Sequence, residues 1–152
     1  RCLTRQILTE LKHTGLLSQI TVLIGPLFED DVTDLKSLFS EVQFVGPLPA
    51  TEQIVKTSSV FITAFGTTIN EAEIFGIPSL IISNRPEDIE DFNLVVENSN
   101  NPERWDFLCD MANDYSSLKG KLDRLLGMKT TQVESVSCDN GWQRCFEELG
   151  LT

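Results

Sequence analysis

Four short runs of large apolar and β-branched residues alternate along the chain with segments of helical periodicity. The runs are Ile20–Ile24, Val42–Val45, Ser59–Thr63 and Pro78–Ile82. Short apolar runs bounded by turn residues are typical of strands buried on both faces of a sheet. Strands that alternate with helices at this spacing predict βαβ units. We therefore expect a Rossmann-like three-layer α/β domain built on a mostly parallel sheet.

The segments between these runs carry apolar residues three and four positions apart, which predicts helices. These helices are expected at Leu3–Lys12, Asp30–Ser40, Ala50–Thr57, Thr67–Phe75 and Glu87–Glu97.

The composition changes after residue 83, where the chain becomes polar and acidic. We expect one domain, with a βα core over residues 1–83 and a mainly helical part over 84–152. Within the second part, Trp105–Leu126 is predicted to be mostly helical, with Gly120 as a possible break, and Trp142–Leu149 to form a closing helix.

Charge and hydropathy exclude several classes of function. The 152 residues include 12 basic and 23 acidic side chains, a net charge of −11. A field of this sign repels nucleic acid and anionic lipid, and the basic residues form no local run. The apolar runs are shorter than the roughly 20 residues of a membrane span. The cysteines form no C-x-x-C pair or metal-ligating pattern, which predicts reduced thiols, a cytoplasmic protein and no metal site.

The stretch Phe61–Ile82 carries the pattern most suggestive of a ligand site. A predicted strand ends, Gly66 allows a tight turn, and Thr67 and Thr68 open the next helix. Backbone N–H groups at such a helix start can hold a phosphate without Lys or Arg. One turn further along, Glu71 is placed to accept the two hydroxyls of a ribose.

A purely structural interpretation of the same residues stays open. Gly66 is also explained by a need for positive φ, and Thr67 by N-capping of the helix. In that case Asn70 and Glu71 only favour the helix dipole.

The run A-F-G-T-T-I-N-E-A-E-I-F-G-I-P-S-L-I-I, from Ala64 to Ile82, resembles a signature in the C-terminal half of GT-B glycosyltransferases. It is similar to the UDP-sugar hydrolases of pseudaminic acid synthesis, with their spore-coat polysaccharide relatives. It is also similar to the N-acetylglucosaminyltransferase that makes lipid II. The resemblance spans Leu3–Ile82 and resumes weakly at Asp139–Arg144.

The resemblance implies a domain that binds a nucleotide sugar, most often a UDP-sugar, as substrate and without a further cofactor. Two groups of residues follow from it by position. The residues implied to bind the nucleotide are Gly66, Thr67 and Thr68 at the diphosphate, Asn70 and Glu71 at the ribose, and Val45, Gly46 and Pro47 along the base. Those implied to approach the sugar are Asn84, Arg85 and Glu87.

The implied parent protein is a glycosyltransferase or UDP-sugar hydrolase of surface-polysaccharide or nonulosonic-acid synthesis, and nucleotide-sugar 2-epimerases share the fold. In such enzymes the general base comes from an N-terminal domain. We therefore expect this domain alone to be inactive, and its catalytic residues are unknown.

The departures from the signature favour an alternative, a degenerate and non-catalytic GT-B-like binding or assembly module. Phe65 precedes a single Gly66, and the usual glutamine after the fourth strand is replaced by Arg85 or Glu87. The first strand of the resembled fold, which precedes the helix at Leu3, is also missing. Either a neighbour supplies that strand or the remaining strands close up without it. An exposed edge left by it would favour a homodimer.

Overall fold

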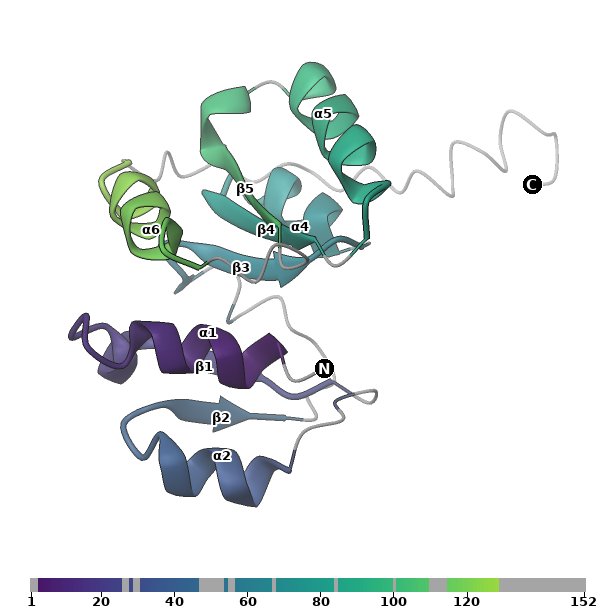
Figure 1. Cartoon of the computed structure of the whole chain (residues 1–152). Coiled ribbons are helices and arrows are strands. Elements are labelled where there is room, and N and C mark those ends of the chain that lie inside the picture. Colours follow the sequence, from purple (N-terminus) through teal and green to yellow (C-terminus); the bar gives the residue numbers. More distant parts are fainter. Residues whose placement is uncertain are drawn as a thin grey trace, which may run out of the picture.

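The computed structural model describes residues 3–25, 28, 31–46, 54, 57–66, 68–83, 85–99, 101–109 and 115–128 (Figure 1). Helices and strands alternate along them, as the apolar periodicity predicts. The helices are α1 (Leu3–Leu11), α2 (Val32–Leu38), α4 (Thr68–Ile74), α5 (Asp88–Asn98) and α6 (Leu118–Leu126), with short 3-10 turns at Leu17–Gln19 and Pro102–Arg104. The strands are β1 (Thr21–Leu23), β2 (Gln43–Val45), β3 (Phe61–Ala64), β4 (Ser79–Ser83) and β5 (Trp105–Cys109).

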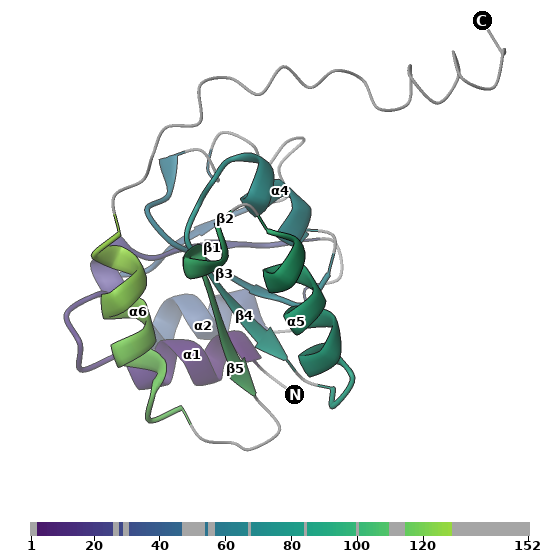
Figure 2. The ribbon, with the colours of Figure 1, turned by 90° about the horizontal axis from the view of Figure 1, so that it is seen from above.

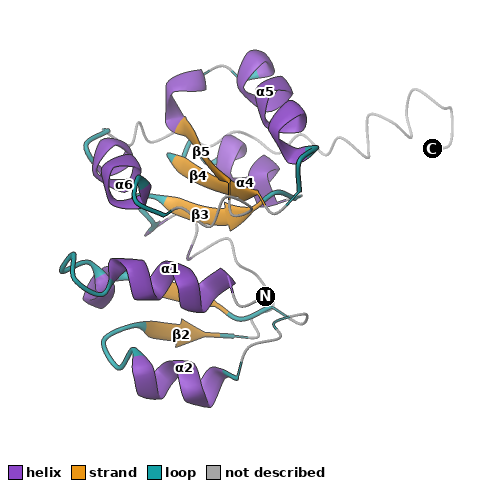
Figure 3. Ribbon diagram, viewed as in Figure 1, coloured by secondary structure: helices purple, strands orange, loops and turns teal. Residues whose placement is uncertain are grey.

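The strands form two parallel sheets instead of one. β1 pairs with β2, and β4 lies between β3 and β5 in the second sheet. Figure 3 shows the arrows of β2 and β3 pointing the same way, with β1 and β3 as the facing edges of the two sheets. No ladder joins these two edges within the described part of the chain. Of the two alternatives for the missing first strand, the closing up of the remaining strands into one sheet is not observed in these residues.

Helices cover the strands on two faces, so the domain has the predicted αβα layers. On one face α1, α2 and α6 share a single apolar core with alternate residues of the strands, among them Val22, Ile62 and Leu80. On the other face α4 and α5 enclose a second cluster around Ile81 and Trp105. Figure 2 shows α4 on one side of the strands and α1 and α2 on the other. The alternation of Leu80 and Ile81 between the two cores follows from the two-residue period of a strand.

The predicted helix over Trp105–Leu126 is wrong at its beginning. Trp105–Cys109 forms strand β5, which pairs in parallel with β4, so the sheet continues beyond residue 83. Trp105 and Leu108, three positions apart, imitate a helical period, but they face opposite cores. Of the other predictions, most of the helix at Ala50–Thr57 and all of the closing helix at Trp142–Leu149 lie outside the described residues.

Gly120 does not break α6, because it lies inside this helix. A Cβ added to it would meet no atom within 4 Å. Gly120→Ala is therefore expected to raise the free energy of unfolding by about 1 kcal/mol, the usual difference between the helix propensities of glycine and alanine. Chemical denaturation checks this value, and an unchanged or lower midpoint contradicts it.

No helix within the described residues has the length and apolar character needed to cross a membrane.

Candidate functional site at the carboxyl ends of the strands

Parallel strands bring their carboxyl ends to one edge of the domain, where ligands of open α/β sheets usually bind. The helices that follow β1 and β3 pack on opposite faces: α2 belongs to one apolar core and α4 to the other. The direction of winding therefore reverses between β1 and β3. In open α/β sheets, ligands bind at such a switch point, between the diverging loops. Here the loops are those after Leu23 and after Ala64.

Gly66 lies at this switch point, in the turn between β3 and α4. Its carbonyl accepts a hydrogen bond from the Ile69 N–H (3.1 Å), which closes the first turn before α4. Its φ is outside the left-handed region, and a Cβ added to it would meet no atom within 4 Å. The structural interpretation of Gly66, a need for positive φ, is therefore wrong.

The other residues predicted near the diphosphate and ribose lie on α4. Thr68 is half-buried at the first position of the helix, and Glu71 is exposed within its first turn. Asn70 lines a hollow of about 320 Å³ between α4 and α5, together with Glu73 and Leu94. Thr67 lies outside the described residues.

Val45 and Gly46, which were predicted to lie along the base, are also at the carboxyl edge of the strands. They belong to the end of β2, however, and β1 lies between β2 and β3 (Figure 1). Gly46 has a structural reason to be glycine. Its φ is +151°, and a Cβ would come within 2.9 Å of the Cβ of Ile24 and closer still to the Ile24 carbonyl oxygen. This contact follows from the ladder, because the Ile24 N–H donates to the Val45 carbonyl (2.8 Å). Pro47 lies outside the described residues.

A buried polar network holds the loop after β4, where the sugar was expected. Ser83 and Asp88 are buried, and Ser83 Oγ lies 2.7 Å from the Arg85 carbonyl oxygen and 3.0 Å from Asp88 Oδ2. The Arg85 N–H donates to Ser83 Oγ (3.2 Å) and to Asp88 Oδ2 (3.3 Å). Arg85 and Glu87 are themselves exposed on this loop. Asn84 lies outside the described residues.

Ser83→Ala is expected to lower the free energy of unfolding by about 1–2 kcal/mol, because the buried Asp88 carboxylate loses a donor. Ser37→Ala, at an exposed position of α2, is the matched control and should change it by less than about 0.5 kcal/mol. Equal effects of the two substitutions in urea denaturation would show that the Ser83 network does not stabilise the loop.

Three residues of this edge were missed by sequence reasoning. Gly25, which follows β1, resembles Gly66: it is exposed, its φ is not positive, and a Cβ would meet nothing within 4 Å. The sequence signal is the same at both positions, a glycine that follows a predicted strand. Ser83 and Asp88 are five positions apart and gave no motif.

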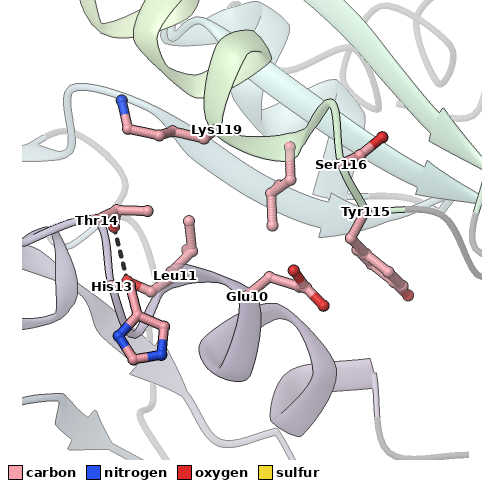
Figure 4. A pocket seen from close by; sticks show the side chains of 8 residues that line it. Glu10, Leu11, His13, Thr14, Tyr115, Ser116 and Lys119 are labelled. Atoms are coloured by element: carbon pink, nitrogen blue, oxygen red, sulfur yellow. Dashed lines mark hydrogen bonds between the residues drawn. The ribbon is translucent and has the colours of Figure 1, made fainter.

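A second hollow, of about 270 Å³, lies between the last turn of α1 and the start of α6 (Figure 4). Glu10, His13, Tyr115 and Lys119 are among the residues that line it. Figure 1 shows this end of α1 opposite the edge to which the arrows of β2 and β3 point. His13, the single histidine of the sequence, therefore lies away from the switch point.

Within the described residues no three His, Cys, Asp or Glu side chains gather as they would around a metal ion. Comparison of the chain with protein-family models, with curated proteins and with solved structures found no match. Any function must therefore be inferred from the residues and their geometry.

Proposed function

We propose that this domain binds a nucleotide sugar, specifically a UDP-sugar. The diphosphate of this ligand would lie at the turn between β3 and α4. The observation that carries the proposal is Gly66. Neither backbone strain nor packing explains a glycine there, because its φ is ordinary and the space at its Cβ is empty. Close approach of a ligand to the backbone is a remaining reason for a glycine at this position.

The charge of the protein favours recognition by backbone groups. With a net charge of −11 the domain has no general attraction for an anion. The positive end of the helix dipole at the start of α4 supplies local positive potential, and the Thr68 hydroxyl adds a donor. The Glu71 carboxylate, one turn along the same helix, is chemically suited to accept the two hydroxyls of a ribose. Arg85 is a cation on the exposed loop after β4, the strand that pairs with β3.

The proposed parent protein is a cytoplasmic glycosyltransferase or UDP-sugar hydrolase, in which this domain anchors the leaving diphosphate. Donors aimed at that group would stabilise the charge that develops on it during transfer of the sugar. The general base would come from an N-terminal domain, so the isolated domain binds nucleotide and turns over nothing.

Titration calorimetry with UDP, CMP and GDP tests the proposal. We expect saturable binding of UDP that Gly66→Val weakens by about tenfold or more, because the added side chain fills the approach to the N–H groups. A Thr67→Ala/Glu71→Ala double variant should lose binding as well. Gly120→Ala is the matched control, since that glycine also has an empty Cβ position but lies on α6.

The outcomes separate the two candidate functions. UDP binding that is unaffected by Gly66→Val would move the site elsewhere and overturn the assignment of these residues. Absence of binding at millimolar UDP, both in this domain and in the full-length parent, would favour the alternative, a non-catalytic binding or assembly module.

A further inference from the structure

The outer sides of α4 and α5 form an exposed apolar surface. The two helices are neighbours on one face of the second sheet, with a hollow of about 320 Å³ between them (Figure 2). Ile69 and Val95 are apolar residues that line this hollow, and Leu94 lines it with 56% of its own surface exposed. Ile74, four positions after the lining residue Asn70, is on the same side of α4 and is 41% exposed. An exposed apolar surface with polar residues around it is typical of an interaction site.

The charge on these two helices has a single sign. Neither α4 nor α5 contains a lysine or an arginine. Their acidic residues are Glu71, Glu73, Asp88, Glu90, Asp91 and Glu97. Two of these have structural partners, since Asp88 is buried beside Ser83 and Glu73 accepts a hydrogen bond from Ser99 Oγ (2.9 Å).

Three exposed carboxylates surround Leu94. Glu90, Asp91 and Glu97 lie three or four positions from it on α5, and residues at these distances are neighbours on the surface of a helix. Within the part of the chain that the structure describes, none of the three has an ion-pair partner. The exposed leucine and the hollow beside it are therefore edged by uncompensated negative charge.

The charge of this surface decides which occupant fits it. Carboxylates around the apolar residue repel anionic lipid and nucleic acid. A second copy placed face to face would bring the same carboxylates against each other. These 152 residues contain no local run of basic residues, so they do not include a complementary segment. A helix with large apolar residues on one side and Lys or Arg three and four positions away matches both features, because its apolar residues fit the hollow and its cations face the carboxylates.

We propose that the surface of α4 and α5 around Leu94 is a docking site for a basic amphipathic helix of a partner protein. The apolar side of that helix lies on Leu94 and Val95, and its lysine or arginine residues pair with Glu90, Asp91 and Glu97. The inference does not depend on the proposed function, because it uses the outer sides of the helices and no ligand at the turn before α4.

Fluorescence anisotropy with a labelled synthetic peptide tests the site on the full chain. The peptide is a helix of about fifteen residues, with leucine along one side and lysine on the flanks of that side. A second peptide has the same composition in scrambled order, so that leucine and lysine are spread around the helix. We expect the amphipathic peptide to bind saturably and about tenfold more tightly than the scrambled one.

Leu94→Ser is expected to weaken binding of the amphipathic peptide by about tenfold, because it removes the central apolar contact. Leu38→Ser is the matched control, since Leu38 is also an exposed leucine (46%) but lies on α2. The control should leave the affinity unchanged.

A second pair of variants separates a local charge contact from general attraction to an acidic protein. Glu90→Gln/Glu97→Gln is expected to weaken binding about fivefold, because two carboxylates beside Leu94 lose their charge. Glu10→Gln/Glu41→Gln removes the same amount of charge from exposed positions elsewhere on the domain and should have a smaller effect. This pair also carries the test if Leu94→Ser does not fold.

Several results would overturn the proposal. Equal weakening by the two leucine variants, or by the two glutamate pairs, would mean that the peptide is held by the overall charge and not at Leu94. Equal affinity of the two peptides, or absence of binding at millimolar concentration, would also count against the site. A dimeric mass in light scattering that Leu94→Ser abolishes would assign the surface to a second copy of the chain.

Discussion

Replacing Gly46 by alanine is expected to lower the free energy of unfolding by about 3 kcal/mol. Its φ of +151° is a conformation that side chains rarely adopt. In addition, the new Cβ would overlap the backbone of Ile24 on the neighbouring strand β1. The ladder holds that contact in place, since the Ile24 N–H donates to the Val45 carbonyl. Relief of the overlap would therefore separate β1 from β2.

Chemical denaturation of Gly46→Ala measures this loss, and Gly25→Ala is the matched control. Gly25 follows the adjacent strand β1, but its φ is not positive and a Cβ there has open space. We expect Gly25→Ala to change the free energy of unfolding by less than about 1 kcal/mol. Similar effects of the two substitutions would contradict the geometry described for Gly46. A role of Gly46 in binding the base of a nucleotide would have to be separated from this structural role.

Asp106→Asn is expected to lower the free energy of unfolding by about 2 kcal/mol, because two cations lose their carboxylate. The Asp106 side chain on β5 is 16% exposed, and Lys121 Nζ lies 2.6 Å from Oδ1. Arg124 reaches Oδ2 at 3.0 Å and also donates to the carbonyls of Glu103 and Trp105. These contacts connect α6 to β5. Asp123→Asn is the control: Asp123 pairs with Lys119 on the exposed face of α6, where a pair contributes less than about 0.5 kcal/mol.

The same carboxylate makes stability depend on pH. Burial raises the pKa of Asp106, but hydrogen bonds from Lys121, the Phe107 N–H and Arg124 outweigh burial and hold it below the ordinary value of 3.8. Because the folded-state pKa is the lower one, the stabilisation is complete above pH 3.8 and is lost as the pH falls through the folded-state value. The difference in unfolding free energy between wild type and Asp106→Asn should therefore shrink below pH 3.8. A difference that stays constant down to pH 2 would contradict this origin.

The four apolar runs and the first helices could be predicted from the sequence because their information is local. Val42–Val45 contains the observed strand β2, and Leu3–Lys12 matches α1 to within one residue. The turn at Gly66 was also predicted, since a glycine between a strand and a helix needs no tertiary partner to be recognised. Whether that glycine serves the backbone or a ligand could not be decided from sequence. The facts that exclude a need for positive φ or for close packing, its backbone angle and the atoms around its missing Cβ, exist only in the folded chain.

Strand β5 shows the limit of this local information. Trp105–Cys109 carries apolar residues at a spacing that fits a helix, and Asp106 interrupts them with a charge. The segment becomes a strand because the edge of β4 is available to it. Lys121 and Arg124, fifteen and eighteen residues further along, neutralise the charge. Both causes are contacts between segments far apart in the sequence, so a local sequence pattern does not predict them.

The amino-acid sequence by itself determined the alternation of strands and helices and hence the parallel αβα class, because periods of two and of three to four residues fix which side chains share a face. Only the tertiary structure decided that the strands divide into two sheets with facing edges at β1 and β3. The physical reason is that strand order depends on which backbone edges meet in space. Every strand carries the same N–H and C=O groups, and its side chains do not specify its neighbour.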